Sequence, residues 1–321
     1  MLLAAFALSM LAACSKTDFS ATENEDDLGE AISGLPSQRA CEADNILFAQ
    51  MAADPDFKKN IEELERHTAQ FIADSRQGII RLSSATIPVV VNVLYRTSAE
   101  NISNAQIQSQ IDILNADFNA MNSEYSSVPA LFAGAKADVD ISFTLQNVIR
   151  KSTTKRSWRT NDDMKKANKG GIAYTPGALN IWVCTLSGGI LGYAQFPGGN
   201  AATDGVVLLN TATGNTGTAA APFDLGRTAT HEVGHWLNLR HIWGDATCGN
   251  DFVGDTPLHN TANYGCPAAS HKSTCTGTPY EMTMNYMDYT DDACMYMFSV
   301  GQKDRMLATF APGGPRAAFA N

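Results

Sequence analysis

Apolar residues between positions 38 and 76 recur at spacings of three or four, which is the period of an amphipathic helix. The positions that make this pattern are Ile46, Leu47, Met51, Phe57, Ile61, Leu64 and Phe71. The pattern predicts a helical segment near the N-terminus. A polar stretch from Arg76 to Arg81 follows, and proteolytic cleavage concentrates in exposed polar stretches of this kind.

The pattern changes at Ile87, where a β-branched run continues to Tyr95 and predicts the first strand of a second region. Residues 102–121 return to helical spacing, and Ser103 is placed to cap that helix. Apolar runs separated by Gly, Pro and Asn predict four further strands, at 139–149, 178–184, 191–196 and 204–209. One helix among several short strands indicates an α/β (α+β) domain with a mixed, twisted sheet over residues 85–321.

The first 14 residues are apolar but too few to span a bilayer, which favours an export signal over a buried helix. The stretch ends in Leu-Ala-Ala-Cys, which is typical of a bacterial lipoprotein signal, although no basic residue precedes it. We therefore expect a secreted protein, or a bacterial outer-membrane or cell-surface lipoprotein anchored at Cys14. Residues 15–37 are polar and acidic, as expected of a flexible tether.

The composition limits the class of protein. The chain has 321 residues, of which 44% are hydrophobic and 17% charged, and its formal net charge is −10. This length allows an accessory segment plus one core-forming domain of roughly 200 to 250 residues. The acidic balance suits a soluble globular protein and is opposite to what a nucleic-acid partner requires.

The segment His-Glu-Val-Gly-His-Trp-Leu-Asn-Leu-Arg-His, residues 231–241, carries the chemistry. His231 and His235 are four residues apart, so on a helix both imidazoles lie on one face and reach one zinc ion. Glu232 is placed to act as the general base on a zinc-activated water. Together with the histidine that ends the segment, these make four fixed residues, and four at these spacings should arise by accident in roughly one such chain in several thousand.

The third histidine, His241, cannot lie on the same face of a continuous helix, because six residues turn the chain by about 240° after His235. The chain must therefore turn between them. Asn238 stands at the position of the turn, and asparagine tolerates the left-handed conformation that ends helices. Histidines that merely cap a helix or face solvent are the alternative, but three of the six histidines in the chain fall in this segment.

A second motif follows at residues 285–289, Asn-Tyr-Met-Asp-Tyr. With both motifs, residues 85–310 resemble the pappalysin/ulilysin (cytophagalysin-like) family of metzincin zinc peptidases. The family usually has glycine where this chain has Asn238. The resemblance implies a metzincin catalytic domain with Met287 as an apolar floor under the zinc and with the Tyr289 phenol directed toward it. Core packing is the simpler role for Met287.

Seven cysteines in an exported chain indicate disulfides. Four of them, Cys248, Cys266, Cys275 and Cys294, lie in a loop-rich C-terminal subdomain, where the sequence alone permits three pairings. Zinc ligation by these four is the alternative, although no C-x2-C pair occurs. The family resemblance implies the pairs 248–275 and 266–294. Cys184 ends a predicted strand and is expected to be a buried free thiol.

Cys41 lies in the predicted N-terminal helical segment, after Arg39 and Ala40. In related zinc peptidases a pro-segment cysteine ligates the zinc and displaces the catalytic water, so the resemblance implies a pro-segment at residues 38–84 and a latent-form zinc ligand at Cys41. A free or disulfide-bonded cysteine remains the alternative. Cleavage is expected between Ser75 and Ser84.

Oxygen-rich side chains follow the zinc motif. Asp251, Asp255 and Thr256 offer the hard donors that calcium prefers, and related enzymes bind structural calcium in this region; a polar surface loop is the alternative. Asp291 and Asp292 could place negative charge near the pocket that receives the side chain after the scissile bond, or could simply solvate a loop.

These observations predict a zinc-dependent endopeptidase acting on protein or peptide substrates, which could pair with residues 191–196 as an added strand. A non-catalytic, zinc-stabilised surface adhesion module is the rival from another class. Glu232 argues against it, because a purely structural zinc site has no use for a carboxylate that is not a ligand. Zinc hydrolysis of a non-peptide amide is a third hypothesis.

Overall fold

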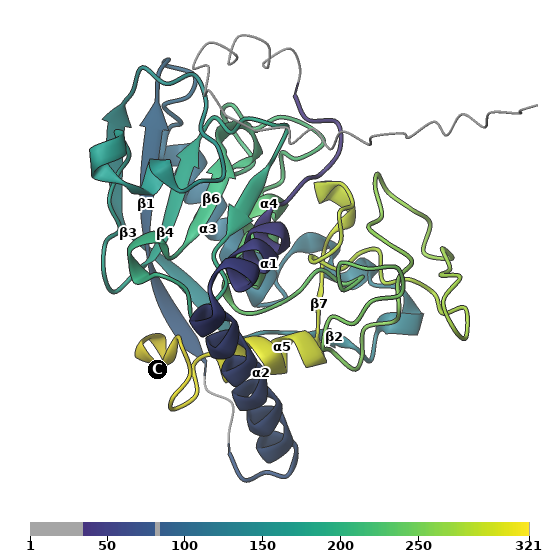
Figure 1. Ribbon diagram of the computed structural model, residues 1–321. Helices are drawn as coiled ribbons and strands as arrows, with labels where there is room; N and C mark the ends of the chain where they lie inside the picture. The colour runs from purple at the N-terminus through teal and green to yellow at the C-terminus, as the bar shows by residue number, and fades with distance from the viewer. Residues whose placement is uncertain (1–34, 81–83, 321) are drawn as a thin grey trace, which may run out of the picture. The chain divides into compact units, whose positions relative to one another are not determined.

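The computed structural model describes residues 35–80 and 84–320. Its centre is a five-stranded sheet with the order β3-β1-β4-β6-β5, in which β5 alone runs antiparallel to its neighbour (Figure 1). The strands are β1 (Ala85–Tyr95), β3 (Ile141–Ser152), β4 (Leu179–Cys184), β5 (Gly192–Ala194) and β6 (Val206–Leu209). The predicted mixed sheet is therefore confirmed.

Both faces of the central strands are covered. Every residue of β4 and β6 is buried, which explains why β6 is a continuous apolar run and β4 is apolar except for Asn180. On one face, α3 (Asn104–Phe118) packs against β3 and against α4 (Arg227–Trp236). The side chain of Ser103 caps α3 by accepting a hydrogen bond from the Gln106 amide, as predicted.

The N-terminal segment, residues 35–80, contains two helices, α1 (Ala43–Ala53) and α2 (Pro55–Arg76), where the periodicity predicted one helical stretch. The break occurs at Asp54, because proline disfavours a helical residue before it and suits the first turn of a new helix. The Asp54 carboxylate accepts from two amides of that turn.

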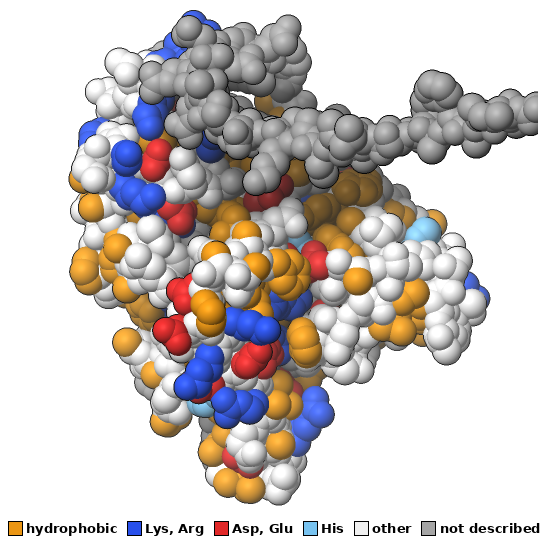
Figure 2. Space-filling model, in the orientation of Figure 1, with side chains coloured by type: hydrophobic (Ala, Val, Ile, Leu, Met, Phe, Trp, Pro, Cys, Tyr) orange, Lys and Arg blue, Asp and Glu red, His pale blue; other side chains and the backbone are white. Residues whose placement is uncertain are grey.

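The helix α2 is amphipathic. Its apolar face is buried, and α2 packs against α5 (Val300–Ala308). Figure 2 shows basic and acidic side chains gathered over the outer face of α2.

The region after α4 has little regular structure and is held by two disulfides, Cys248–Cys275 and Cys266–Cys294, with Cα–Cα distances of 5.7 and 5.6 Å. A two-stranded ribbon of β2 (Lys136–Ala137) and β7 (Phe298–Ser299) joins it to the segment after α3. The single-turn helices are η1 (Ser123–Ser127), η2 (Ala130–Phe132), η3 (Asp163–Lys165), η4 (Ala167–Lys169), η5 (Ala201–Thr203), η6 (Asn210–Ala212), η7 (Asp292–Cys294) and η8 (Ala317–Phe319).

Cys184, at the end of β4, is buried and unbonded. Within residues 35–80 and 84–320, no helix is long and apolar enough to cross a membrane. The predicted export signal with Cys14, and most of the predicted tether, lie outside the described residues.

Candidate active site

Three histidines from α4 and the chain after it meet in the interior of the protein. His231 and His235 are one turn apart on α4, and their Nε2 atoms are 3.1 Å apart. The Nε2 atom of His241 lies 3.2 Å from that of His235. All three side chains are buried, so the three nitrogens face one another in a site closed to bulk solvent.

The turn that returns His241 to the site is made at Asn238, whose φ of 72° is left-handed. The amide of Leu239 then donates to the carbonyl of Gly234, 2.9 Å away, which closes the end of the helix. Arg305 from α5 donates from Nε to the Asn238 carbonyl at 2.7 Å and fixes the turn from outside.

Each imidazole is oriented through its other nitrogen. The Nδ1 atoms of His231, His235 and His241 contact, respectively, Tyr286 O at 2.7 Å, Leu239 O at 2.9 Å and Asp245 Oδ1 at 2.6 Å. When Nδ1 carries the proton and donates it to these oxygens, the lone pair of each Nε2 points into the site. Burial lowers the pKa of His235 to about 3 and of His241 to about 4, so both stay in the neutral form that binds metals.

The donor set fits zinc. The Cys41 sulfur and one nitrogen from each histidine lie within 4.8 Å of one another. Nitrogens 3.1–3.2 Å apart lie close to the edge, about 3.3–3.4 Å, of a tetrahedron around an ion with Zn–N bonds of about 2.0–2.1 Å. Three imidazoles and a thiolate form a closed tetrahedral set, whereas three imidazoles alone leave the open position of a catalytic site.

Glu232 is buried beside these donors, and the Cys41 thiol donates to its Oε2 over 3.3 Å. Burial raises the pKa of Glu232 to about 8, although the hydrogen bond from Cys41 lowers it. The carboxylate fits here because residue 192 on β5 is glycine: a Cβ there would stand 3.0 Å from Glu232 Oε1.

The second motif lies under and beside the histidines. The Met287 amide donates to the Asn285 side chain, and the buried Met287 sulfur lies against α4 at Gly234. The hydroxyl of Tyr289 accepts from the Cys41 amide at 3.1 Å and donates to the Cys41 carbonyl at 3.0 Å. The N-terminal segment therefore places its Cys41 sulfur among the three histidines and engages the Tyr289 hydroxyl with its main chain.

The main chain of the N-terminal segment continues the sheet. Cys41 forms a parallel bridge with Gly192, and the Leu191 amide donates to the Ala40 carbonyl at 3.0 Å. Residues 191–196, predicted as a substrate-binding edge, are a strand only at 192–194, and this short edge carries the segment around Cys41.

The Arg39 side chain extends into the interior and pairs with the buried carboxylate of Asp292. Its guanidinium contacts Asp292 Oδ1 at 2.5 Å and also donates to Thr228 Oγ1 at 3.0 Å. Of the two predicted acidic residues, Asp292 and not Asp291 makes this ion pair.

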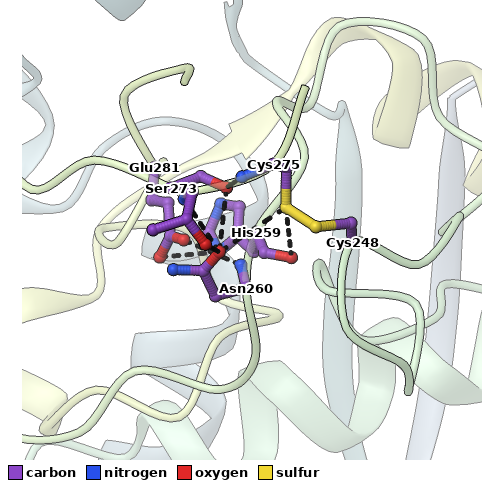
Figure 3. Close-up of a disulfide and its surroundings, with 7 residues drawn as sticks. Cys248, His259, Asn260, Ser273, Cys275 and Glu281 are labelled. Atoms are coloured by element: carbon purple, nitrogen blue, oxygen red, sulfur yellow. Dashed lines mark hydrogen bonds and ion pairs between the residues drawn. A yellow bond between two sulfur atoms is a disulfide. The ribbon is translucent and has the colours of Figure 1, made fainter. Parts of the chain in front are cut away.

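The disulfide-bonded loops support the second motif. Figure 3 shows the Cys248–Cys275 disulfide beside His259, Asn260, Ser273 and Glu281. The Ser273 hydroxyl donates to Asn260 Oδ1, and the main-chain amide of Asn260 donates to Glu281 Oε1. From Glu281 the network continues through Asn263, whose side chain donates to Glu281 Oε2 at 2.7 Å and to Asp288 Oδ2 at 2.9 Å.

Asp288 separates Met287 from Tyr289, so the network ends at the floor of the site. Burial raises the pKa of Asp288 to about 7, while hydrogen bonds from Asn263 lower it.

The predicted calcium donors do not form one group in this structure. Asp251 Oδ2 accepts from Thr256 Oγ1 at 2.8 Å, whereas Asp255 accepts from Ser299 Oγ and the Gly301 amide at the start of α5. The two clusters of three or more metal-type donors found within the described residues contain neither aspartate.

Two residues that were not predicted from the sequence hold the His241 ring in place. Trp243 stacks on the His241 ring with centroids 4.3 Å apart and planes 6° apart, and Asp245 binds its Nδ1. The only signal in the sequence is that Asp245 lies four residues after His241.

A buried trio of imidazoles beside a carboxylate, above a methionine-containing turn and on this mixed sheet, defines the chain as a metalloendopeptidase. The family model described as pregnancy-associated plasma protein-A (peptidase M43) matches residues 179–311. The chain belongs to this pappalysin family.

Curated relatives and solved structures agree with this class. An extracellular metalloprotease of Verticillium alfalfae is 34% identical over 73% of this chain and 80% of its own length, and one of Arthroderma benhamiae is 32% identical over 87% and 93%. Promirolysin of Tannerella forsythia, solved as a point mutant, covers 88% of this chain and 97% of its own, with a TM-score of 0.80 and 39% identity. Mature mirolysin with a cleaved peptide covers 74% and 96%, with a TM-score of 0.71 and 44% identity.

Proposed function

We propose that the mature protein is a secreted zinc endopeptidase in which His231, His235 and His241 hold the metal and Glu232 is the general base. The observation that carries this proposal is the convergence of three Nε2 atoms, each aimed by a hydrogen bond at Nδ1. The names of the extracellular relatives support secretion.

Zinc held by the three imidazoles would supply Lewis-acid chemistry, polarising the scissile carbonyl and lowering the pKa of a water molecule. Glu232 takes the proton from that water on Oε2 and then delivers it to the nitrogen of the leaving amine. The place that Cys41 Sγ occupies, 3.3 Å from Oε2, is where the water must lie for this transfer. Tyr289, once free of the Cys41 main chain, donates its phenolic hydrogen to the developing oxyanion.

Residues 38–84 act as a pro-segment in this proposal, with Cys41 as the zinc ligand of the latent form. The Cys41 sulfur is buried among the three histidines, and its main chain fills the edge of β5. The match to promirolysin extends over more of this chain than the match to mature mirolysin, 88% against 74%, which supports a separate N-terminal segment. Cleavage between Ser75 and Ser84, after α2, would release it.

The same segment indicates the substrate. The guanidinium of Arg39 fills a buried position with Asp292 at its base, and we propose that this position receives a basic side chain after the scissile bond. The guanidinium donates from its three nitrogens to Asp292, Thr228 and the Thr290 carbonyl. An ammonium group cannot reach three separated acceptors at once, so arginine is preferred to lysine.

Digestion of a peptide library by the matured protein, analysed by mass spectrometry, tests this function. The expected products carry arginine at their new N-termini. The Glu232→Gln variant serves as the control, because it keeps the zinc ligands. If the matured protein cleaves no peptide bond in the library, the adhesion module or the hydrolysis of a non-peptide amide would be favoured.

Two further predictions stay open. Calcium at Asp251 and Thr256 would require Asp255 to turn away from α5, and a thermal shift on adding calcium would reveal it. A lipid on Cys14 would be detected by mass spectrometry of the N-terminal peptide.

A further inference from the structure

A second buried charge of the N-terminal segment lies on the other side of Cys41. Asp44, in the first turn of α1, is buried, and its Oδ1 accepts from Arg240 Nη1 at 3.0 Å. Its Oδ2 lies 3.1 Å from Nδ1 of His241, which already binds Asp245. The same oxygen lies 3.7 Å from Nδ1 of His235, so in the precursor Asp44 pairs with Arg240 and also lies close to two of the three imidazoles.

Arg240 is built into the wall of the site. Its guanidinium lies over the ring of Phe196, 4.7 Å from the centroid, just beyond the end of β5. Its Nε is buried and has no hydrogen-bond partner in the described part of the chain. Asp44 therefore uses only part of the donor set, and a carboxylate in a better position could take two donors at once.

The two buried ion pairs flank the zinc position. Arg39 precedes Cys41 by two residues and reaches Asp292, whereas Asp44 follows it by three and reaches Arg240. A peptide that passes through the site along β5 must run past both positions. If the Asp292 position receives the side chain after the scissile bond, the Arg240 position faces residues before it.

We propose that Arg240 is the specificity-determining residue of a carboxylate-binding subsite on the side before the scissile bond, which Asp44 occupies in the precursor. This inference rests on the proposed peptidase function and adds an acidic residue to the preferred substrate. Departure of the segment removes Asp44 and uncovers the guanidinium.

Space for a larger ligand lies next to this position. A cavity of about 610 Å³ lies between α1, α2 and the chain after α4, and Phe48, Arg240, Asp245 and Phe252 are among the residues that line it. When Phe48 and the rest of α1 leave, Arg240 remains over the Phe196 ring and still lines this cavity. Asp245 is engaged with His241, which leaves the Arg240 guanidinium available to bind a carboxylate of the substrate.

The test uses protein matured from the full-length precursor and peptides with arginine after the scissile bond. Glutamate or glutamine is placed at the second, third or fourth position before that bond. At one or more positions, we expect glutamate to raise kcat/KM about tenfold over glutamine, mainly through KM. The ratio of kcat/KM for the glutamate peptide to that for the glutamine peptide should fall to about 1 in Arg240→Gln and below 1 in Arg240→Glu. Arg159→Gln, which removes an exposed arginine, should keep the ratio of the parent.

Equal kcat/KM for both peptides in the parent at all three positions would overturn the subsite while leaving the peptidase in place. A glutamate-to-glutamine ratio in Arg240→Gln that matches the parent would also overturn it, because another residue would then select glutamate. Failure of the parent to cleave any of these peptides would overturn both proposals.

A second measurement does not depend on the folding of Arg240 variants. A synthetic peptide of residues 38–50 should inhibit the matured parent, and Asp44→Asn in that peptide should weaken inhibition about tenfold. Equal inhibition by the two peptides would overturn the proposal that Arg240 forms a carboxylate-binding subsite.

Discussion

Gly234 and Met287 are in direct contact beneath the three histidines: a Cβ on Gly234 would stand 2.5 Å from the Met287 sulfur. Gly234→Ala should therefore push α4 and the methionine turn apart, at a cost of about 1–3 kcal/mol in the free energy of unfolding. Denaturant unfolding in a Glu232→Gln background, which prevents self-cleavage, measures the cost. Gly134→Ala is the matched control, because nothing lies within 4 Å of a Cβ there. Equal costs would show that the contact is readily relieved.

Replacement of Glu232 by glutamine should lower kcat by about a hundredfold to ten-thousandfold while leaving zinc content unchanged, because it removes the base and no ligand. Metal analysis and peptide turnover of the matured protein check both parts. Turnover close to that of the parent would exclude Glu232 as the base.

Asp245→Ala should weaken zinc binding by about 10–100-fold, because it removes the partner that orients His241. The measurement requires the matured form, since Asp44 also lies near the same nitrogen in the precursor. His241→Ala should lose zinc and activity together, and Asp112→Ala, at an exposed position, should change neither. Zinc affinity unaltered by His241→Ala would mean that the third ligand lies elsewhere.

Asn238→Gly should be neutral or stabilising. Glycine adopts a φ of 72° without strain, and the buried side-chain amide of Asn238 has no hydrogen-bond partner among the described residues. Asn238→Val should destabilise the turn by about 1–3 kcal/mol and weaken zinc binding, since a β-branched residue resists positive φ. Competition with a chelator measures the affinities; normal zinc binding by the valine variant would contradict this account of the turn.

Cys41→Ala should yield a precursor that is active early or processes itself faster, because the fourth zinc position opens to water. Cobalt-substituted precursors carrying Glu232→Gln give a direct test: the thiolate-to-metal absorption band should be present with Cys41 and absent in Cys41→Ala. Cys184→Ala, which removes the second buried free thiol of the described residues, should keep the band. If the parent precursor lacks the band, Cys41 is not a metal ligand, and latency would then result from steric blockage of the site by the pro-segment.

The sequence by itself determined the parts of the site that depend on short-range spacing. His231, Glu232 and His235 belong to one helix, so 3.6 residues per turn fixes their relation before any tertiary contact forms. The turn at Asn238 could be inferred for the same reason, because six residues of helix would place His241 on the wrong face. Apolar runs likewise indicated the mixed sheet, although a strand at 191–196 is limited to three residues by its short pairing with β6.

Only the tertiary structure decided which groups approach from far along the chain. Arg39 meets Asp292 across 253 positions, and Asp44 meets Arg240 across 196. No periodicity encodes such pairs, because each charge is compatible with solvent until the sheet edge and α1 bring it into the interior. The cost of burying an unpaired charge then selects the partner, and this selection is a property of the folded protein alone.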